Sequence, residues 1–336
     1  MSHSRDATLA ILYGASIPRT PVFSGLPSLT ASGLRDAAIR YSEAHTDSAK
    51  LAAAAASTFE TWGFESAVVP FDLCVEAEAL GCHVDFQTDL DIFMPPVVDV
   101  PLGWKGGDPG FSEGLSRGGR IPLVADAIRR LKEGVGREIA IGAWVPGPFT
   151  LAWQLFGADA WLSGMNNRAQ AAEILDKAAL FLAVVAQTYV RAGADFLTVH
   201  EMGGSPQVIG AEAFRVWVKP ALVKLFALLP SPKVLSVCGN TNAIVFDLAE
   251  CGADALSFDQ LNDIARTRRM LPHAVLLGNL DPVGLLSQGT PEDVSRAVRQ
   301  AEAAGVNAIW PGCDLLPEIP DANLRALMVT GESRRP

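Results

Sequence analysis

The most constraining feature of this chain is a pattern that recurs along its second half. Short apolar stretches with strand character end in side chains that can bind a metal, titrate or form hydrogen bonds: His200 with Glu201, Cys238, Asp259 with Gln260, Asn279, and Cys313. Apolar segments with helical character separate these stretches. Strands that alternate with helices predict a parallel sheet whose functional residues gather at the carboxyl ends of the strands.

The pattern extends to the whole chain. Strand-then-helix units begin near residues 19, 67, 138, 196, 233, 255, 274 and 308. Eight units predict a single closed (β/α)8 barrel of the TIM type over residues 1–336, with extra helices near the amino terminus. An open doubly wound sheet is the alternative, but no glycine fingerprint and no phosphate-loop sequence follows a strand. The glycine-rich residues 104–120 predict a long loop that can act as a lid.

Composition excludes several classes of partner. The chain has 27 basic and 37 acidic residues and a net charge of −10, which argues against nucleic acid and anionic membranes as partners. The apolar run at residues 178–186 is far too short to span a bilayer. The amino terminus lacks a signal-peptide pattern, so we expect a cytoplasmic protein. Its five cysteines form no CxxC pair, which predicts core thiols or metal ligands rather than disulfides.

Alternation along the strands predicts which side chains point into the barrel. It places Thr198 with His200, and Ser257 with Asp259, on the inner face. One cavity is then expected to collect Asp72, His200, Cys238, Asp259, Asn279 and Cys313. Thiolate, imidazole and carboxylate are the usual zinc ligands, so Cys238, Cys313, Asp259 and His200 are candidate ligands. The competing interpretation is ordinary packing, since a buried cysteine is more often a small apolar side chain, and it is preferred for Cys74, Cys82 and Cys251.

Several motifs carry a family resemblance, and they occur in order along nearly the whole chain: Glu43-Ala-His-Thr-Asp47, residues 69–82, Val145-Pro-Gly-Pro-Phe149, Cys238-Gly-Asn-Thr241, Ser257-Phe-Asp-Gln260, residues 277–283, residues 289–292 and Pro311-Gly-Cys313. Together they resemble the uroporphyrinogen decarboxylase superfamily. Within it they look most like the methylcobamide:coenzyme M methyltransferase branch. The resemblance implies a single (β/α)8 barrel, in agreement with the count of strand-then-helix units.

The resemblance also implies a chemistry. In the methyltransferase branch, positions that match Cys238, Cys313 and Asp259 bind zinc, which activates a thiol to take a methyl group from a methylcobamide. The histidine of the family motif is replaced here by Ser236, and our hypothesis is that His200 supplies the imidazole instead. The donor would be held by a separate corrinoid protein, and the acceptor would be a thiol or a folate.

Further residues are candidates for substrate contact. Asn240, Gln260 and Asn279 are expected to orient the acceptor, and Glu201 stands beside His200 at a strand end. Glu76 and Glu78 follow the Asp72 strand end, where a role in binding and a role as solvated helix charges are equally good interpretations.

Two other functions stay open at this point. Asp72 falls where the decarboxylase branch keeps a pyrrole-binding aspartate, so a lyase acting on a tetrapyrrole or another carboxylated ligand is the alternative. Against it, residues 23–30 lack the arginines that would neutralise such a ligand. Ser236 also leaves room for a non-catalytic, corrinoid-binding barrel. The superfamily suggests a monomer or a homodimer.

Overall fold

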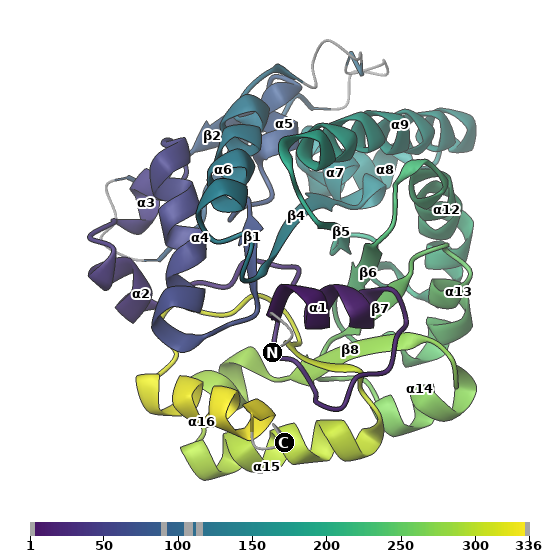
Figure 1. Cartoon of the computed structure of the whole chain (residues 1–336). Coiled ribbons are helices and arrows are strands. Elements are labelled where there is room, and N and C mark those ends of the chain that lie inside the picture. Colours follow the sequence, from purple (N-terminus) through teal and green to yellow (C-terminus); the bar gives the residue numbers. More distant parts are fainter. Residues whose placement is uncertain (1–3, 89–92, 104–109, 112–116, 333–336) are drawn as a thin grey trace.

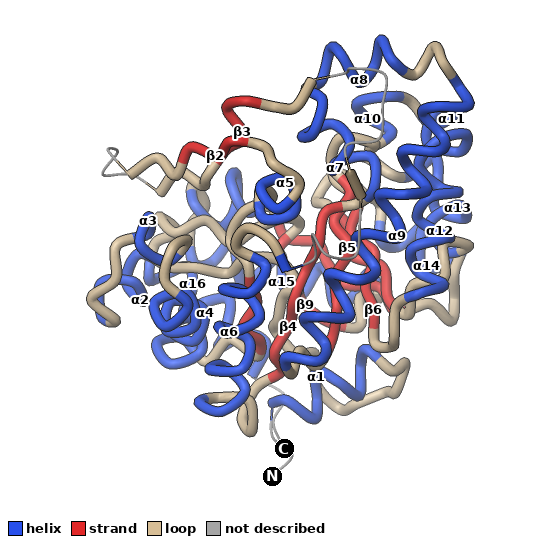
Figure 2. The backbone as a smooth tube through the Cα atoms, turned by 90° about the horizontal axis from the view of Figure 1, so that it is seen from above, coloured by secondary structure: helices blue, strands red, loops and turns tan. Residues whose placement is uncertain are grey.

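A parallel sheet forms the centre of the molecule. The computed structural model describes residues 4–88, 93–103, 110–111 and 117–332. Seven strands lie in the order β1-β4-β5-β6-β7-β8-β9 and curl into a TIM-type barrel (Figures 1 and 2). Their bounds are β1 Ser66–Val69, β4 Ala140–Pro146, β5 Phe196–Glu201, β6 Lys233–Val237, β7 Ala255–Phe258, β8 Val275–Leu280 and β9 Ala308–Pro311. The predicted α/β barrel is therefore confirmed. A separate antiparallel pair, β2 (His83–Asp85) and β3 (Val97–Val100), lies outside the sheet.

The position of the eighth strand is filled by an irregular segment. The strand predicted at residues 19–23 is wrong in detail, because only isolated bridges join Val22 to Ile309 and Ser28 to Leu315. Pro21 has no amide hydrogen to donate, and the amide of Val22 donates to the Glu65 side chain (2.9 Å) instead of to a neighbouring strand. The Phe23 amide still reaches the Ile309 carbonyl at 3.2 Å. This extended segment thus closes the barrel between β9 and β1 without a regular ladder.

The two faces of the sheet carry different cores, as alternation predicted. Leu197 and Val199 pack outward with the helices, and so do Leu256 and Phe258. The inner cluster includes Phe23, Trp144, Phe196, Val234 and Trp310, which fill the barrel. Apolar side chains therefore fill the inside of the barrel. His200 lies beyond them, near the carboxyl ends of the strands.

Helices cover the outside of the sheet (Figure 1). The longer ones are α4 Ser48–Trp62, α6 Ile121–Gly134, α7 Pro148–Phe156, α9 Arg168–Ala192, α12 Lys219–Leu228, α14 Ile264–Met270, α15 Pro291–Ala304 and α16 Asp321–Glu332. Asp47 caps the amino terminus of α4, where its side chain accepts hydrogen bonds from the amides of Ala49 and Lys50. Shorter elements are α2 Ala31–Asp36, α3 Tyr41–Ala44, α5 Val75–Ala79, α8 Ala158–Gly164, α10 Pro206–Ile209, α11 Ala211–Ala213, η3 Asn242–Ile244, α13 Val245–Ala249 and the π-helical turns η2 Phe214–Val218 and η4 Pro282–Ser287.

The amino end of the barrel is covered, which leaves the carboxyl end for function. Helix α1 (Ser4–Leu12) lies across it: the Arg5 side chain pairs with Asp195, just before β5, at 2.7 Å. At the opposite end in Figure 2 lie α8, α10 and the β2–β3 pair. Residues 104–109 and 112–116 of the predicted lid loop lie outside the described residues. Among the described helices, none combines the length and apolar character needed to cross a membrane.

Candidate active site

Three potential metal ligands meet at the carboxyl end of the barrel. His200 lies on β5, Cys238 directly follows β6, and Cys313 follows β9. The ligating atoms of these three side chains all lie within 4.8 Å of one another, and Nε2 of His200 is 3.4 Å from Sγ of Cys238. The parallel register pairs His200 with Ser236, and Cys238 stands two residues further along, on the same face as Ser236.

Ser236 orients the imidazole. Its hydroxyl lies 3.0 Å from Nδ1 of His200, which leaves Nε2 directed at the thiols. The indole of Trp144 packs edge-on against the imidazole, with ring centroids 5.9 Å apart. A metal-binding histidine normally has its second nitrogen fixed by such a hydrogen bond. The serine that replaces the family histidine therefore acts as a partner of His200 in this structure.

The donor set suits zinc. One imidazole and two thiols match its preferred ligands, and three protein ligands leave a fourth position for a substrate. The hydrogen bond of the Cys313 thiol to Cys238, together with burial, raises the pKa of Cys313 well above its usual value. A bound cation opposes this effect, because coordination deprotonates a thiol.

Asp259 does not join this group. Strand β7 ends at Phe258, so the alternation that predicted an inward aspartate no longer applies one residue later. Its carboxylate instead accepts hydrogen bonds from the amides of Gly239 (3.1 Å) and Leu261 (3.0 Å). Asp259 thus ties the loop after β6 to the loop after β7, and the prediction that it completes the ligand set does not match this geometry.

Asp72 is buried and fully paired. Arg120 donates to both carboxylate oxygens, at 2.7 and 2.9 Å, and Nδ1 of His45 lies 2.9 Å from one of them. Burial acts to raise the pKa of Asp72, but the hydrogen bond with His45 and the charge of Arg120 outweigh it and hold the pKa well below its usual value. Arg120 also donates to Glu78 at 2.6 Å. Sequence reasoning missed Arg120 because it stands 48 positions from Asp72.

Three of the predicted substrate contacts hold loops in place. Glu201 accepts from the amides of Phe149 (3.2 Å) and Gly204 (3.0 Å) and from the hydroxyl of Thr150. Asn240 accepts from the amide of Asn242 at 3.1 Å. Asn279 donates to the carbonyl of Asn262 at 3.0 Å. These contacts occupy the carboxylate of Glu201, the amide oxygen of Asn240 and the amide nitrogen of Asn279.

Two predicted residues have buried oxygens without a regular partner among the residues that the structure describes. Oε1 of Gln260 accepts no hydrogen bond from them, and it lies so close to Gly312 that a side chain there would collide with it. Both carboxyl oxygens of Glu76 also lack a regular hydrogen bond, and the side chain is fully buried. Gln260 therefore lies next to the segment that contains Cys313, whereas Glu76 is buried in the protein interior.

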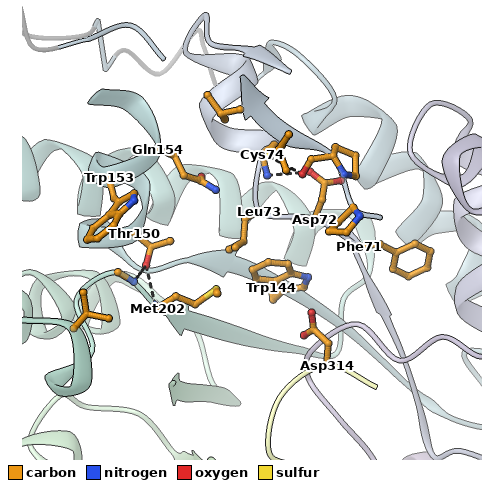
Figure 3. A pocket seen from close by; sticks show the side chains of 16 residues that line it. Phe71, Asp72, Leu73, Cys74, Trp144, Thr150, Trp153, Gln154, Met202 and Asp314 are labelled. Carbon is orange, nitrogen blue, oxygen red and sulfur yellow. Dashed lines mark hydrogen bonds between the residues drawn. The ribbon is translucent and has the colours of Figure 1, made fainter. Parts of the chain in front are cut away.

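A cavity of about 550 Å³ lies on the other side of Trp144 from His200 and has Trp144 and Asp314 in its lining (Figure 3). Its lining is mostly apolar and includes Phe71, Leu73, Trp144, Trp153, Met202 and Val208, with polar groups from Asp72, Thr150, Gln154 and Asp314. Trp144 connects the cavity to His200, and Asp314 directly follows Cys313. Burial raises the pKa of Asp314 to about 6, and the His200 charge opposes that shift. Sequence reasoning missed Asp314, although its place next to Cys313 was a usable signal.

The fold and the site together define a TIM-type barrel protein whose carboxyl end carries two thiols and an imidazole that could hold a metal ion. The chain belongs to the uroporphyrinogen decarboxylase family, whose sequence profile matches residues 3–333. The family resemblance seen in the motifs is thereby confirmed.

The individual proteins that this chain resembles include both methyltransferases and decarboxylases. The chain is 31% identical over 317 residues to the methylcobamide:CoM methyltransferase MtbA of Methanosarcina acetivorans, covering 93% of this chain and 92% of that protein. A uroporphyrinogen decarboxylase of Chlorobaculum tepidum is 26% identical over 301 residues, covering 79% of each chain. A solved methyltransferase from Methanosarcina mazei superposes with a TM-score of 0.92 at 27% identity, covering 99% of each chain. The methyltransferase branch therefore matches more completely than this decarboxylase.

Proposed function

We propose that this protein transfers a methyl group from a methylated corrinoid to a thiol. One observation carries the proposal: His200, Cys238 and Cys313 bring their ligating atoms within 4.8 Å of one another beside an apolar cavity. The similarity to methylcobamide:CoM methyltransferases over more than nine-tenths of the chain supports it. The second predicted acceptor class, a folate, has no observation in its favour.

His200, Cys238 and Cys313 would hold a zinc ion. When bound, zinc lowers the pKa of an acceptor thiol, so that its sulfur is nucleophilic at neutral pH. Ser236 keeps Nε2 of His200 directed at the site, and Trp144 covers the imidazole from the cavity side. The apolar lining excludes water, which strengthens the electrostatic interactions within the cavity.

The methyl transfer is a displacement at carbon. The acceptor sulfur forms a bond to the methyl carbon while the bond from that carbon to cobalt breaks, and cobalt keeps the electron pair. The thiol proton leaves to solvent when the acceptor binds. The corrinoid is a substrate in this reaction, and we propose that a separate corrinoid protein presents it at the carboxyl end of the barrel.

The lyase alternative gains no support from Asp72. Its carboxylate already accepts from Arg120, His45 and the amide of Cys74, so it offers no free oxygen to the pyrrole nitrogens of a tetrapyrrole. The non-catalytic barrel differs from an enzyme only in turnover, and the following experiment separates the two.

The first measurement is the zinc content of protein purified without chelator, by elemental analysis. We expect about one zinc per chain, its loss in Cys238→Ser, Cys313→Ser and His200→Ala, and a parallel loss of methyl transfer from methylcobalamin to thiols. Cys251→Ser is the matched control, because Cys251 is buried between α13 and the start of β7, outside the ligand cluster, and donates to the Asp247 carbonyl, as a serine also can.

Each contrary result has a distinct meaning. Full zinc in His200→Ala would remove His200 from the ligand set. No zinc after reconstitution would exclude thiol activation by this site. Bound zinc and bound methylcobalamin without transfer to any thiol would support the non-catalytic barrel.

A further inference from the structure

The charged side chains described in the lining of the cavity are acidic. Two of its polar lining groups are carboxyls, Asp72 and Asp314, while no lysine, arginine or histidine is among the lining residues that the structure describes. Arg120 lies behind Asp72, and its guanidinium already pairs with Asp72 and Glu78. The described lining of this cavity therefore offers no free cation to the anionic end of a ligand.

Asp314 is available for a ligand. It lines the cavity, and within the described parts of the chain no hydrogen bond or ion pair engages its carboxylate. In Figure 3 its side chain points towards the indole of Trp144, across the cavity from Gln154. Asp314 is half-buried, and its carboxyl oxygens can accept hydrogen bonds from a donor on a ligand.

Gln154 also lines this cavity with a polar atom that lacks a partner. Its carbonyl oxygen Oε1 is buried, and no described residue donates a hydrogen bond to it. The other polar hydroxyl there, that of Thr150, already donates to Glu201 and accepts from the amides of Met202 and Gly203. The described part of this apolar cavity thus holds a buried acceptor on Gln154 and a half-buried one on Asp314, and an occupant that brings donors would satisfy both.

We propose that this cavity selects a methyl acceptor whose end away from the thiol carries a hydrogen-bond donor or a positive charge, such as a short aminothiol, and that Asp314 recognises that end. The proposal rests on the proposed function, because it names the class of acceptor for that reaction. An ammonium group beside Asp314 gains charge-assisted hydrogen bonds. A sulfonate would lose its hydration next to a carboxylate of like charge and gain no cation in return.

The test uses three thiols that share one carbon skeleton: mercaptoethylamine, mercaptoethanol and mercaptoethanesulfonate, which is coenzyme M. With zinc-loaded protein and methylcobalamin, we expect kcat/KM for the amine to exceed that for the sulfonate by about tenfold or more. In Asp314→Asn the ratio of amine to sulfonate should fall by about tenfold. Because the same thiols are compared in both proteins, their intrinsic reactivities cancel. Glu318→Gln is the matched control, an exposed carboxyl on the same segment that does not line the cavity, and it should keep the wild-type ratio.

A second readout separates this proposal from the proposed function. Calorimetric titration with the methylthio product of each thiol measures binding without turnover, and the product that carries the amine should bind tightest. Turnover with any thiol but a wild-type preference for the sulfonate would overturn the acceptor proposal and leave the function intact. Absence of turnover with the expected order of binding would overturn the function alone. An equal loss for all three thiols in Asp314→Asn, or no binding of the amine product, would also overturn the acceptor proposal.

Discussion

At the scale of single residues, Glu76 stands out because its carboxyl group is fully buried without a regular hydrogen bond. The hydroxyl of Tyr189, itself buried, is near enough to influence it. Burial raises the pKa of Glu76 from its ordinary value of 4.5 to about 8. The folded protein therefore favours the protonated, neutral form at neutral pH, whereas the unfolded chain favours the charged form.

This difference predicts a pH-dependent stability. Between pH 4.5 and 8 the folded state binds one more proton at Glu76 than the unfolded state, so this residue's contribution to stability is full below pH 4.5 and is lost as the pH rises through 8. Glu76→Gln removes that loss. We compare the free energy of unfolding of the variant with that of wild type. From pH 5 to pH 8 the difference should shift in favour of the variant by about 3–5 kcal/mol, as measured by urea unfolding at both pH values.

A control for this prediction lies on the same helix. Glu78 pairs with Arg120, so Glu78→Gln removes an ion pair and should show no comparable gain at high pH. An equal effect of Glu76→Gln at pH 5 and pH 8 would mean that Glu76 stays ionised in the folded protein.

At the scale of elements, the irregular segment that replaces the eighth strand depends on close packing. A β-carbon on Gly25 would lie 2.6 Å from Cη2 of Trp310 and 3.0 Å from the ring of Phe196, and it would also collide with Thr198. Trp310 and Phe196 are buried inside the barrel and have little room to move. We expect Gly25→Ala to lower the free energy of unfolding by about 1–3 kcal/mol.

The matched control is a glycine with free space. Gly134 ends α6, and a β-carbon added there would meet no atom within 4 Å and no left-handed backbone. Gly134→Ala should be neutral or stabilising by up to about 1 kcal/mol. Chemical denaturation of both variants checks the pair, and equal stabilities would show that the segment at Gly25 is free to move away from Trp310.

The sequence predicted the direction of a side chain where the strand that carries it is long enough for the two-residue period to hold. On β5, alternation correctly set Leu197 outward and His200 inward, because the strand is long enough for the period to hold. Asp259 and Asp314 lie just beyond strand ends, where loop hydrogen bonds rather than the pleat set the direction of a side chain. The partner of Asp72 could not be predicted, since an ion pair between distant segments leaves no periodic signal.

At the scale of the whole molecule, the proposed zinc ligands join strands that are far apart in the sequence. His200, Cys238 and Cys313 come from β5, the end of β6 and the end of β9. A cation bound only by the folded form stabilises the entire barrel by mass action. Zinc-loaded protein should therefore melt several degrees above protein treated with chelator, as followed by circular dichroism.

The ligand variants supply the control for this melting experiment. Cys238→Ser should melt at the same temperature with and without zinc, and Cys251→Ser should respond as wild type does. If chelator leaves the melting temperature of the wild-type protein unchanged, the ion does not connect these strands. The single domain over residues 1–336, the cytoplasmic location and the choice between monomer and homodimer stay predictions.

The way the barrel closes has a consequence for how it assembles. Only a few main-chain bonds, among them Phe23 to Ile309 and Glu65 to Val22, join the segment between β9 and β1 to its neighbours. The first of these pairs groups 286 positions apart, whereas neighbouring strands elsewhere in the sheet follow one another along the chain, with only the β2–β3 pair intervening between β1 and β4. Contacts of such high sequence separation are slow to form, so we expect this seam to form late when the chain folds. It is also the line along which the cylinder opens with the fewest main-chain bonds broken.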